Sequence, residues 1–195
     1  MKHPWMRTVA ALVVGVALGA GAAAQTVERE GVKLEPTAQV GGTALQLNGA
    51  GVRTRAIFKV YVAGLYVPAK SNSATALLAQ KGPRRMQLTM LRNLDADSFG
   101  GALNDGLKNN HTEAQLAAFK PQIDALNAAV KAVDEVKKGD VVSIEFAPDT
   151  GTRILHNGQP KGPAMAGEDF HAAVLRIWLG EKPADADLKK GLLGG

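Results

Sequence analysis

The longest apolar run outside the N-terminal segment covers residues 47–68, LNGAGVRTRAIFKVYVAGLYVP. β-branched and aromatic side chains are dense from residue 57 onward, which favours a strand over a helix. Both faces of this strand would be mainly apolar, so the run predicts a central strand covered on two sides. The small, turn-prone residues 48–51, Asn-Gly-Ala-Gly, predict a turn immediately before the strand.

Three polar side chains, Arg53, Lys59 and Tyr61, accompany this run. Strict alternation places Lys59 and Tyr61 on one face of the strand, and the predicted turn decides whether Arg53 joins them. The planar fork of an arginine suits a carboxylate or another oxyanion, and a tyrosine adds one donor. Buried cations without a nearby acid are unfavourable unless an anion binds, so the group suggests an anion site. The alternative is that Arg53 pairs with a surface acid or a strand-end carbonyl.

The N-terminus has the features of a secretory signal peptide. Lys2 and Arg7 provide a positive start, residues 8–20 carry no charge, and the alanines 22–24 form a cleavage signal before Gln25. The apolar run is shorter than the ~20 residues of a membrane-spanning helix and has the cleavage signal at its end. A cleaved peptide is therefore favoured over a membrane anchor.

We predict a signal peptide over residues 1–24 and one domain over residues 25–195. Loss of the two N-terminal cations lowers the formal net charge from +5 to about +3, which is too mild to predict a nucleic-acid partner. The absence of cysteine is compatible with a periplasm, where a free thiol would be at risk. We expect a periplasmic protein that has no stable membrane anchor after cleavage and that is stabilised by packing.

Periodicity along the chain predicts strands, then helices, then strands, then a helix. Alternation predicts strands at residues 32–34, 43–47, 84–92, 141–147 and 152–156, with a hairpin turn at Asn157-Gly158 and the end of the sheet at residues 161–163. Helical spacing and capping residues predict helices that begin near Ser73, Asp95 or Asp97, Thr112, Pro121 and Glu168, and a last short helix over residues 185–193. This order is typical of an α+β fold with a largely antiparallel sheet.

The sequence lacks the patterns of common catalytic and metal sites. None of the four histidines, His3, His111, His156 and His171, has another His or Cys at a ligand spacing, so no metal is expected. Neither a glycine-rich phosphate loop nor a Gly-x-Ser-x-Gly elbow occurs, and no cofactor is expected. The cationic group around Arg53 is the remaining candidate site.

Four segments together resemble the chalcone isomerase family. They are LNGAGVRTRAIFKVYVAGLYV, LTMLRNLDADSFGGAL, SIEFAPDTGTRILHNGQ and GEDFHAAVLRIWLG, and they span nearly all of residues 25–195. The resemblance is stronger to the bacterial, exported branch of chalcone isomerase-like proteins. It implies an open-faced β-sandwich, a large antiparallel sheet with helices layered on one side, and a cleft between the sheet and the helices.

The resemblance also assigns site residues. Arg53 falls on the arginine that binds the substrate phenolate in the plant enzymes, and Tyr61 takes the place of a threonine that holds a water and the substrate ketone. Phe99 stands where the enzymes have a tyrosine and Gly106 where they have an asparagine, so an apolar, roomier wall is expected and two donors are lost. In the fatty-acid-binding members of the family, an arginine and a tyrosine hold the carboxylate, as Arg53 and Tyr61 would here.

Three hypotheses follow. The first is a non-catalytic protein that binds a small apolar ligand with an anionic head, such as a fatty acid, through Arg53, Tyr61, Lys59 and Phe99. The alternative is an isomerase (an intramolecular lyase) acting on a chalcone-like or other unsaturated ketone, for which no catalytic residue is assigned. A second alternative is a non-catalytic interaction protein in which the arginine is structural. An enclosed cavity that ends at Arg53 would favour the first two, and a filled core there would favour the third.

Overall fold

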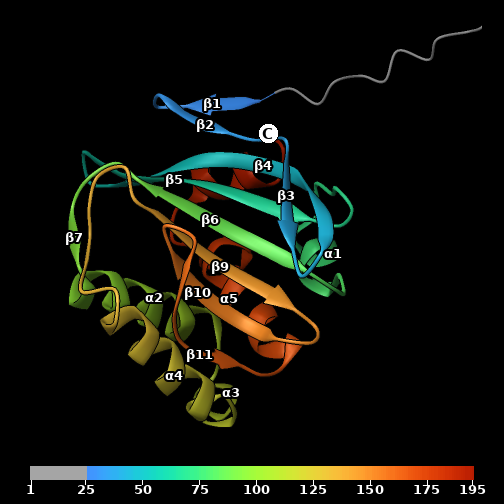
Figure 1. Cartoon of the computed structure of the whole chain (residues 1–195), viewed down its shortest axis with the longest axis vertical. Helices are drawn as coiled ribbons and strands as arrows, with labels where there is room; N and C mark the ends of the chain where they lie inside the picture. Colours follow the sequence, from blue (N-terminus) through green and yellow to red (C-terminus); the bar gives the residue numbers. More distant parts are fainter. Residues whose placement is uncertain (1–25) are drawn as a thin grey trace, which may run out of the picture.

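Seven strands form one antiparallel sheet, which Figure 1 shows together with the helices around it. The computed structural model describes residues 26–195, so the predicted signal peptide, residues 1–24, lies outside the described residues. The strand order in the sheet is β11 (Gln159–Met165), β10 (Gly151–His156), β9 (Val141–Ala147), β6 (Arg84–Met90), β5 (Phe58–Val67), β4 (Thr43–Arg55) and β3 (Thr37–Val40). Two small antiparallel pairs are separate from it, β1 (Val27–Arg29) with β2 (Val32–Leu34) and β7 (Leu94–Asp95) with β8 (Glu135–Val136). The predicted α+β class with an antiparallel sheet is confirmed.

Helices cover one face of this sheet. They are α1 (Ala74–Ala79), α2 (Ala96–Asn110), α3 (Glu113–Ala118), α4 (Lys120–Lys131), α5 (Glu168–Leu179) and α6 (Ala186–Leu192). The larger hydrophobic core lies between the sheet and the helices and includes Trp178 and Phe170. A smaller core on the opposite face packs Val62 and Tyr66 of β5 against Leu34 of the β1–β2 hairpin. No helix within residues 26–195 is long and apolar enough to cross a bilayer.

Local sequence signals explain where the helices begin and end. The Asp95 carboxylate accepts a hydrogen bond from the Ser98 amide (2.7 Å) and caps α2, because the first amides of a helix have no partner within the helix. Thr112 caps α3 in a reciprocal pair with the Gln115 side chain. Pro121 lies in the first turn of α4, where no N–H is needed. These predicted helix starts are confirmed.

The strand boundaries near the glycines and prolines differ from the prediction. Residues 48–51 are not a turn: they lie inside β4, and the chain turns back at Ala56 and Ile57. The sheet does not end at residues 161–163, because β11 continues through them. β11 is an edge strand, and an edge position tolerates a proline that cannot donate to a neighbouring strand.

The glycines of β4 allow helix α6 to lie directly on the strand. A Cβ atom at Gly49 would overlap the backbone oxygens of Gly191 and Leu192, and one at Gly51 would lie 3.0 Å from the Leu188 side chain. Glycine in a strand interior commonly marks such a close backbone approach. The glycine-rich segment therefore provides a docking surface for α6.

Asn48 stabilises the contact between β4 and α6 through hydrogen bonds. Asn48 is the extra residue of a β-bulge between Leu47 and Gly49, so it has no partner residue on β5. The Asn48 amide donates to the Leu192 oxygen (2.7 Å) and to the Ser71 oxygen (3.0 Å), and its oxygen accepts from the Ser71 amide (2.7 Å). One buried side chain thus connects β4, the loop after β5 and the end of α6.

Replacing Gly49 with alanine tests this docking. Gly49→Ala should lower the free energy of unfolding by about 1–3 kcal/mol, because a methyl group would be forced against the α6 backbone. Gly101→Ala is the matched control on the exposed surface of α2, where a Cβ meets nothing within 4 Å, and it should stabilise the protein by about 0.5–1 kcal/mol. Urea unfolding curves measure both changes. Equal stability of Gly49→Ala and the parent would contradict the docking role.

A buried polar cluster lies at the start of β6. Arg84 is fully buried, its Nη2 is 3.1 Å from the Glu168 Oε1, and its guanidinium lies 5.6 Å from the centre of the Phe146 ring. The His171 ring stacks on the Phe146 ring at 5.4 Å between ring centres, and the His171 Nδ1 is 3.4 Å from the Thr152 hydroxyl. Burial, followed by the positive charge of Arg84, lowers the pKa of His171 to about 3. His171 is therefore neutral in the folded protein.

The neutral histidine predicts loss of stability in acid. The pKa of His171 is below its ordinary value of 6.5, so the unfolded chain binds a proton that the folded chain rejects. The contribution of neutral His171 to the free energy of unfolding is fully present above pH 6.5 and is lost as the pH falls toward about 3. Each unit of pKa difference between the folded and unfolded chain corresponds to about 1.4 kcal/mol. Unfolding measured across this range should show a steeper acid decline for the parent than for His171→Gln. Parallel curves for the two proteins would be evidence against a buried neutral histidine.

Candidate ligand-binding cleft

A β-bulge in β5 decides which way the predicted site residues point. Arg53 of β4 pairs with Tyr61, and Thr54 pairs with Lys59, so Val60 is left over. Two adjacent residues at such a bulge can face the same side, and both Val60 and Tyr61 pack into the core under the helices. Lys59 consequently points to the opposite side, where its Nζ forms an ion pair with Glu30 (2.6 Å).

An open cleft runs between the end of the β4–β5 hairpin and helix α2. One part of about 310 Å³ is mainly apolar and is bounded by Ala56, Phe58, Val60, Leu94, Phe99 and Ala102. The adjoining part of about 480 Å³ is polar and is bounded by Thr54, Asp105, Asn109 and the segment 182–184 before α6. Arg53, Arg55 and Ser98 border both parts. The cleft therefore has an apolar and a polar end that meet at two arginines.

Arg53 occupies the junction between the two ends. Its guanidinium lies 5.7 Å from the centre of the Tyr61 ring, a favourable cation–π distance. Its Nε atom is buried and has no hydrogen-bond partner within residues 26–195. A buried donor without a partner is unfavourable, so an acceptor that entered the cleft would be stabilised here.

The Tyr61 ring lies under the Arg53 guanidinium, on its core side, and does not border either part of the cleft. It is 3 % exposed, and its hydroxyl accepts a hydrogen bond from the Trp178 indole (2.8 Å). Burial raises the pKa of Tyr61, although the positive charge of Arg53 opposes the shift. The phenol is thus a neutral group that is bonded to Trp178 of α5 and lies next to the Arg53 guanidinium.

Positive charge dominates the cleft. Arg53, Arg55, Arg92 and Lys182 border it, whereas Asp105 is the one acid on its border among the described residues. Opposite charges attract over several ångströms in a partly desolvated site, so the cleft favours an anion.

The walls of the cleft depart from the expected roomy shape. Phe99 is 3 % exposed and closes the floor of the apolar part, as predicted for an apolar wall. Gly106 does not enlarge the cavity behind it, because the Ile177 side chain of α5 fills that space and would lie 2.6 Å from a Cβ at this position. The small residue brings α2 and α5 together, and the cleft is open to solvent.

Of the four predicted ligand-binding residues, the structure brings three together and separates one. Arg53 and Phe99 border the cleft, Tyr61 lies beneath Arg53, and Lys59 is on the other face of the sheet. The placement of Lys59 beside Tyr61 was wrong because strict alternation does not hold across the bulge. The sequence analysis also missed Arg55 and Lys182. Arg55 was detectable as a neighbour of Arg53 on the same strand, whereas nothing in the sequence connects residue 182 to residue 53.

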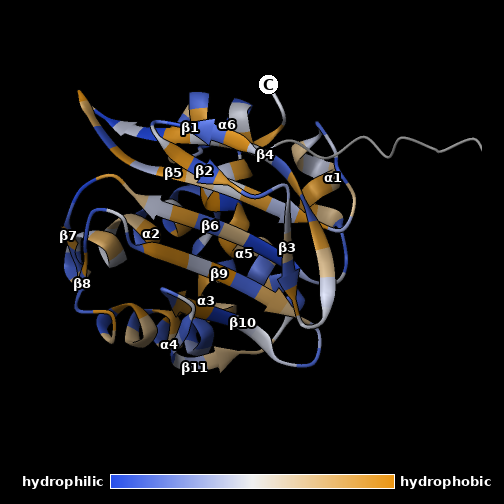
Figure 2. Cartoon of the chain, turned by 45° about the horizontal axis from the view of Figure 1, so that its top comes forward, coloured by the Kyte–Doolittle hydropathy of each residue, from blue (hydrophilic) through white to orange (hydrophobic). Residues whose placement is uncertain are grey.

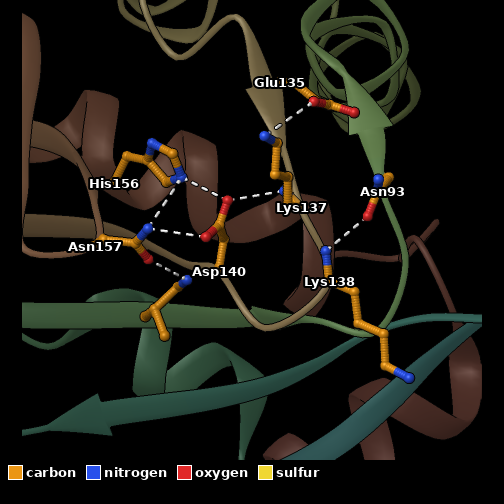
Figure 3. Close-up of polar contacts among 8 residues, drawn as sticks. Asn93, Glu135, Lys137, Lys138, Asp140, His156 and Asn157 are labelled. Carbon is orange, nitrogen blue, oxygen red and sulfur yellow. Dashed lines mark hydrogen bonds and ion pairs between the residues drawn. The ribbon is translucent and has the colours of Figure 1, made fainter.

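A second polar cluster, drawn in Figure 3, is a structural clamp. The Asp140 carboxylate accepts hydrogen bonds from the Asn157 amide (2.9 Å) and the Lys137 backbone (2.8 Å), and it pairs with His156 (2.9 Å). The Asn157 hydrogen bond, followed by that from Lys137, lowers the pKa of Asp140 to about 2. These contacts join the β8–β9 turn to the β10–β11 hairpin. No group of three or more His, Cys, Asp or Glu residues in positions 26–195 is placed to hold a metal.

Comparison with known proteins identifies the family. The model of the chalcone isomerase-like family matches residues 25–194, and the chain belongs to that family, as its sequence segments predicted. The structure is similar to the crystal structure of a fatty-acid binding protein from Arabidopsis thaliana, with a TM-score of 0.66 and 13% sequence identity over 87% of this chain and 96% of that one. At this identity the likeness establishes the fold. A search of the curated proteins found no match.

Proposed function

We propose that the protein binds a small apolar carboxylate, such as a fatty acid, in the cleft beside the β4–β5 hairpin. The observation that carries the proposal is the position of Arg53 at the meeting point of an apolar and a polar pocket, with a buried donor that has no partner in the described part of the chain. The carboxylate would lie at Arg53 and Arg55, and the chain would lie over Phe58, Val60 and Phe99. The Arabidopsis protein of similar structure is a fatty-acid binding protein, which supports the same ligand class.

Simple energetics agree with this arrangement. A hydrogen bond from a charged donor to a carboxylate contributes about 1.5–3 kcal/mol, and each buried methylene adds roughly 0.8 kcal/mol. The apolar part, at about 310 Å³, is at the lower end of the ~300–1,000 Å³ common for ligand pockets. Affinity should therefore increase with chain length only until a medium-length chain fills the pocket.

The same residues support catalysis less well than binding. Formation of an enolate needs oriented hydrogen-bond donors, each worth about 3–4 kcal/mol in comparable sites. Phe99 and Gly106 offer no side-chain donor, and Tyr61 is 3 % exposed with its hydroxyl bonded to Trp178. We accordingly propose a binding protein, and efficient cyclisation of a chalcone by the purified protein, abolished in Arg53→Ala, would favour the isomerase instead.

We also propose that the domain acts in the periplasm after removal of residues 1–24 and has no stable membrane anchor. Support comes from the charged start, the short apolar run and the alanine cleavage signal. N-terminal sequencing of the protein from a soluble periplasmic fraction should give Gln25 as the first residue. Membrane-bound protein that still begins at Met1 would contradict this proposal.

Titration of Arg53 variants tests the ligand site. Arg53→Ala should weaken binding of a medium-chain fatty acid by about ten- to a hundredfold, because a charge-assisted hydrogen bond is lost. Arg53→Lys should restore only part of the affinity, since the planar fork is absent. Calorimetry with fatty acids and their methyl esters measures the effect, and the esters should bind the parent weakly.

Two variants serve as matched controls. Lys59→Ala removes a cation from the neighbouring strand β5 on the opposite face of the sheet and should leave the affinity unchanged. Tyr61→Phe should lower stability by about 1–3 kcal/mol, because the buried Trp178 indole loses its acceptor, with a smaller effect on affinity. The carboxylate-anchor proposal is wrong if esters bind as well as acids, or if Arg53→Ala binds like the parent.

A further inference from the structure

The turn between β4 and β5 exposes two large apolar side chains. Ile57 is 85% exposed and Phe58 is 53% exposed, and they are the large hydrophobic residues most open to solvent in residues 26–195. Figure 2 shows this turn projecting from the body of the molecule with a hydrophobic tip. A single exposed apolar residue is common on soluble proteins, but two adjacent ones on a projecting tip call for an explanation.

The fold itself does not require these residues. A two-residue hairpin turn favours glycine, asparagine or aspartate, which adopt positive φ with little strain. Ala56 instead takes a φ of 53°, and Ile57 beside it belongs to neither hydrophobic core. A polar turn would close the same hairpin at least as well, so local stability does not explain an isoleucine here.

Positive charges surround the apolar tip. Arg55 precedes the turn, Lys59 follows it, and the Arg92 guanidinium lies 4.8 Å from the centre of the Phe58 ring. Lys59 is paired with Glu30, whereas Arg55 and Arg92 form no ion pair with any of residues 26–195. The tip thus combines an apolar wedge with unpaired cations.

We propose that this tip docks on an anionic lipid surface, with Ile57 and Phe58 entering the headgroup region and Arg55 and Arg92 contacting lipid phosphates. Apolar side chains flanked by cations are the combination that binds reversibly to anionic membranes. A stable protein interface needs about 800 Å² per partner, whereas a Phe and an Ile offer only a few hundred, which favours a lipid surface over a second copy or another protein.

The cleft described above opens beside the same tip. Phe58 borders its apolar part, so a docked hairpin would bring the mouth of the cleft to the lipid surface. The docking proposal goes beyond the proposed function and does not need a fatty acid to be bound. Ile57 borders neither part of the cleft, so its variants test docking separately from ligand binding.

Vesicle co-sedimentation tests the proposal. Residues 25–195, which contain both hydrophobic cores and the family match, are used so that the N-terminal apolar run does not contribute. The protein should bind vesicles that contain phosphatidylglycerol, bind pure phosphatidylcholine vesicles far less, and dissociate when salt is raised from about 0.05 M to about 0.5 M. Ile57→Ser should weaken binding by about tenfold while the unfolding midpoint and fatty-acid affinity stay unchanged.

A tryptophan at the tip provides a direct readout. Ile57→Trp should shift its fluorescence to shorter wavelength on anionic vesicles, whereas Ala118→Trp, on the exposed surface of α3 far from the tip, should not. Absence of binding to anionic vesicles, equal binding by Ile57→Ser, or equal shifts for both tryptophans would overturn the proposal. Concentration-dependent dimerisation of the parent that is lost in Ile57→Ser would also overturn it and assign the tip to self-association.

Discussion

Burial of β5 on both faces is the constraint on which the rest of the structure depends. One face packs under the helices through Tyr61, Ala63 and Leu65, and the other packs under the β1–β2 hairpin through Val62 and Tyr66. A strand covered on two sides can carry unpaired charged groups only where its burial ends. That end is the β4–β5 turn, and the cationic cleft is found there.

The C-terminal segment completes the cleft because two glycines let it approach β4. Gly49 and Gly51 allow α6 to lie on the strand, which brings residues 182–184 to the polar wall. Asp185 connects α6 to β4 through hydrogen bonds. One of its carboxylate oxygens caps α6, and the other accepts a hydrogen bond from the Thr54 amide (2.9 Å). Capping and docking therefore share one side chain, and the position of Lys182 follows from the glycines of a strand far away in the sequence.

The β4–β5 hairpin joins two features that are chemically distinct. On the inner side, Arg53 rests on Tyr61, whose hydroxyl is fixed by Trp178 of α5, so the cation is oriented by the core. On the outer side, Ile57 is exposed at the tip and makes no contribution to either core. Rigid support of a cation next to an exposed apolar tip is an arrangement suited to receiving an amphipathic molecule at a surface.

The secondary-structure elements with local sequence signals could be predicted from the sequence alone. Alternation at residues 84–92 and 141–147, the caps Asp95 and Thr112, and the hairpin at Asn157-Gly158 depend on neighbouring residues, and the segments that resemble the family depend on residue identity alone. The prediction of Arg53 and Phe99 as site residues also depends on residue identity, and both border the cleft. The tertiary structure decided what depends on distant contacts or on a single inserted residue. The bulge at Val60 places Lys59 on the opposite face of the sheet from Tyr61. Contact with the α6 backbone requires a glycine at position 49, and the Ile177 side chain fills the space next to Gly106. A period-two pattern carries no information on an extra residue in the ladder, and a glycine does not show whether a turn, a cavity or another backbone needs it.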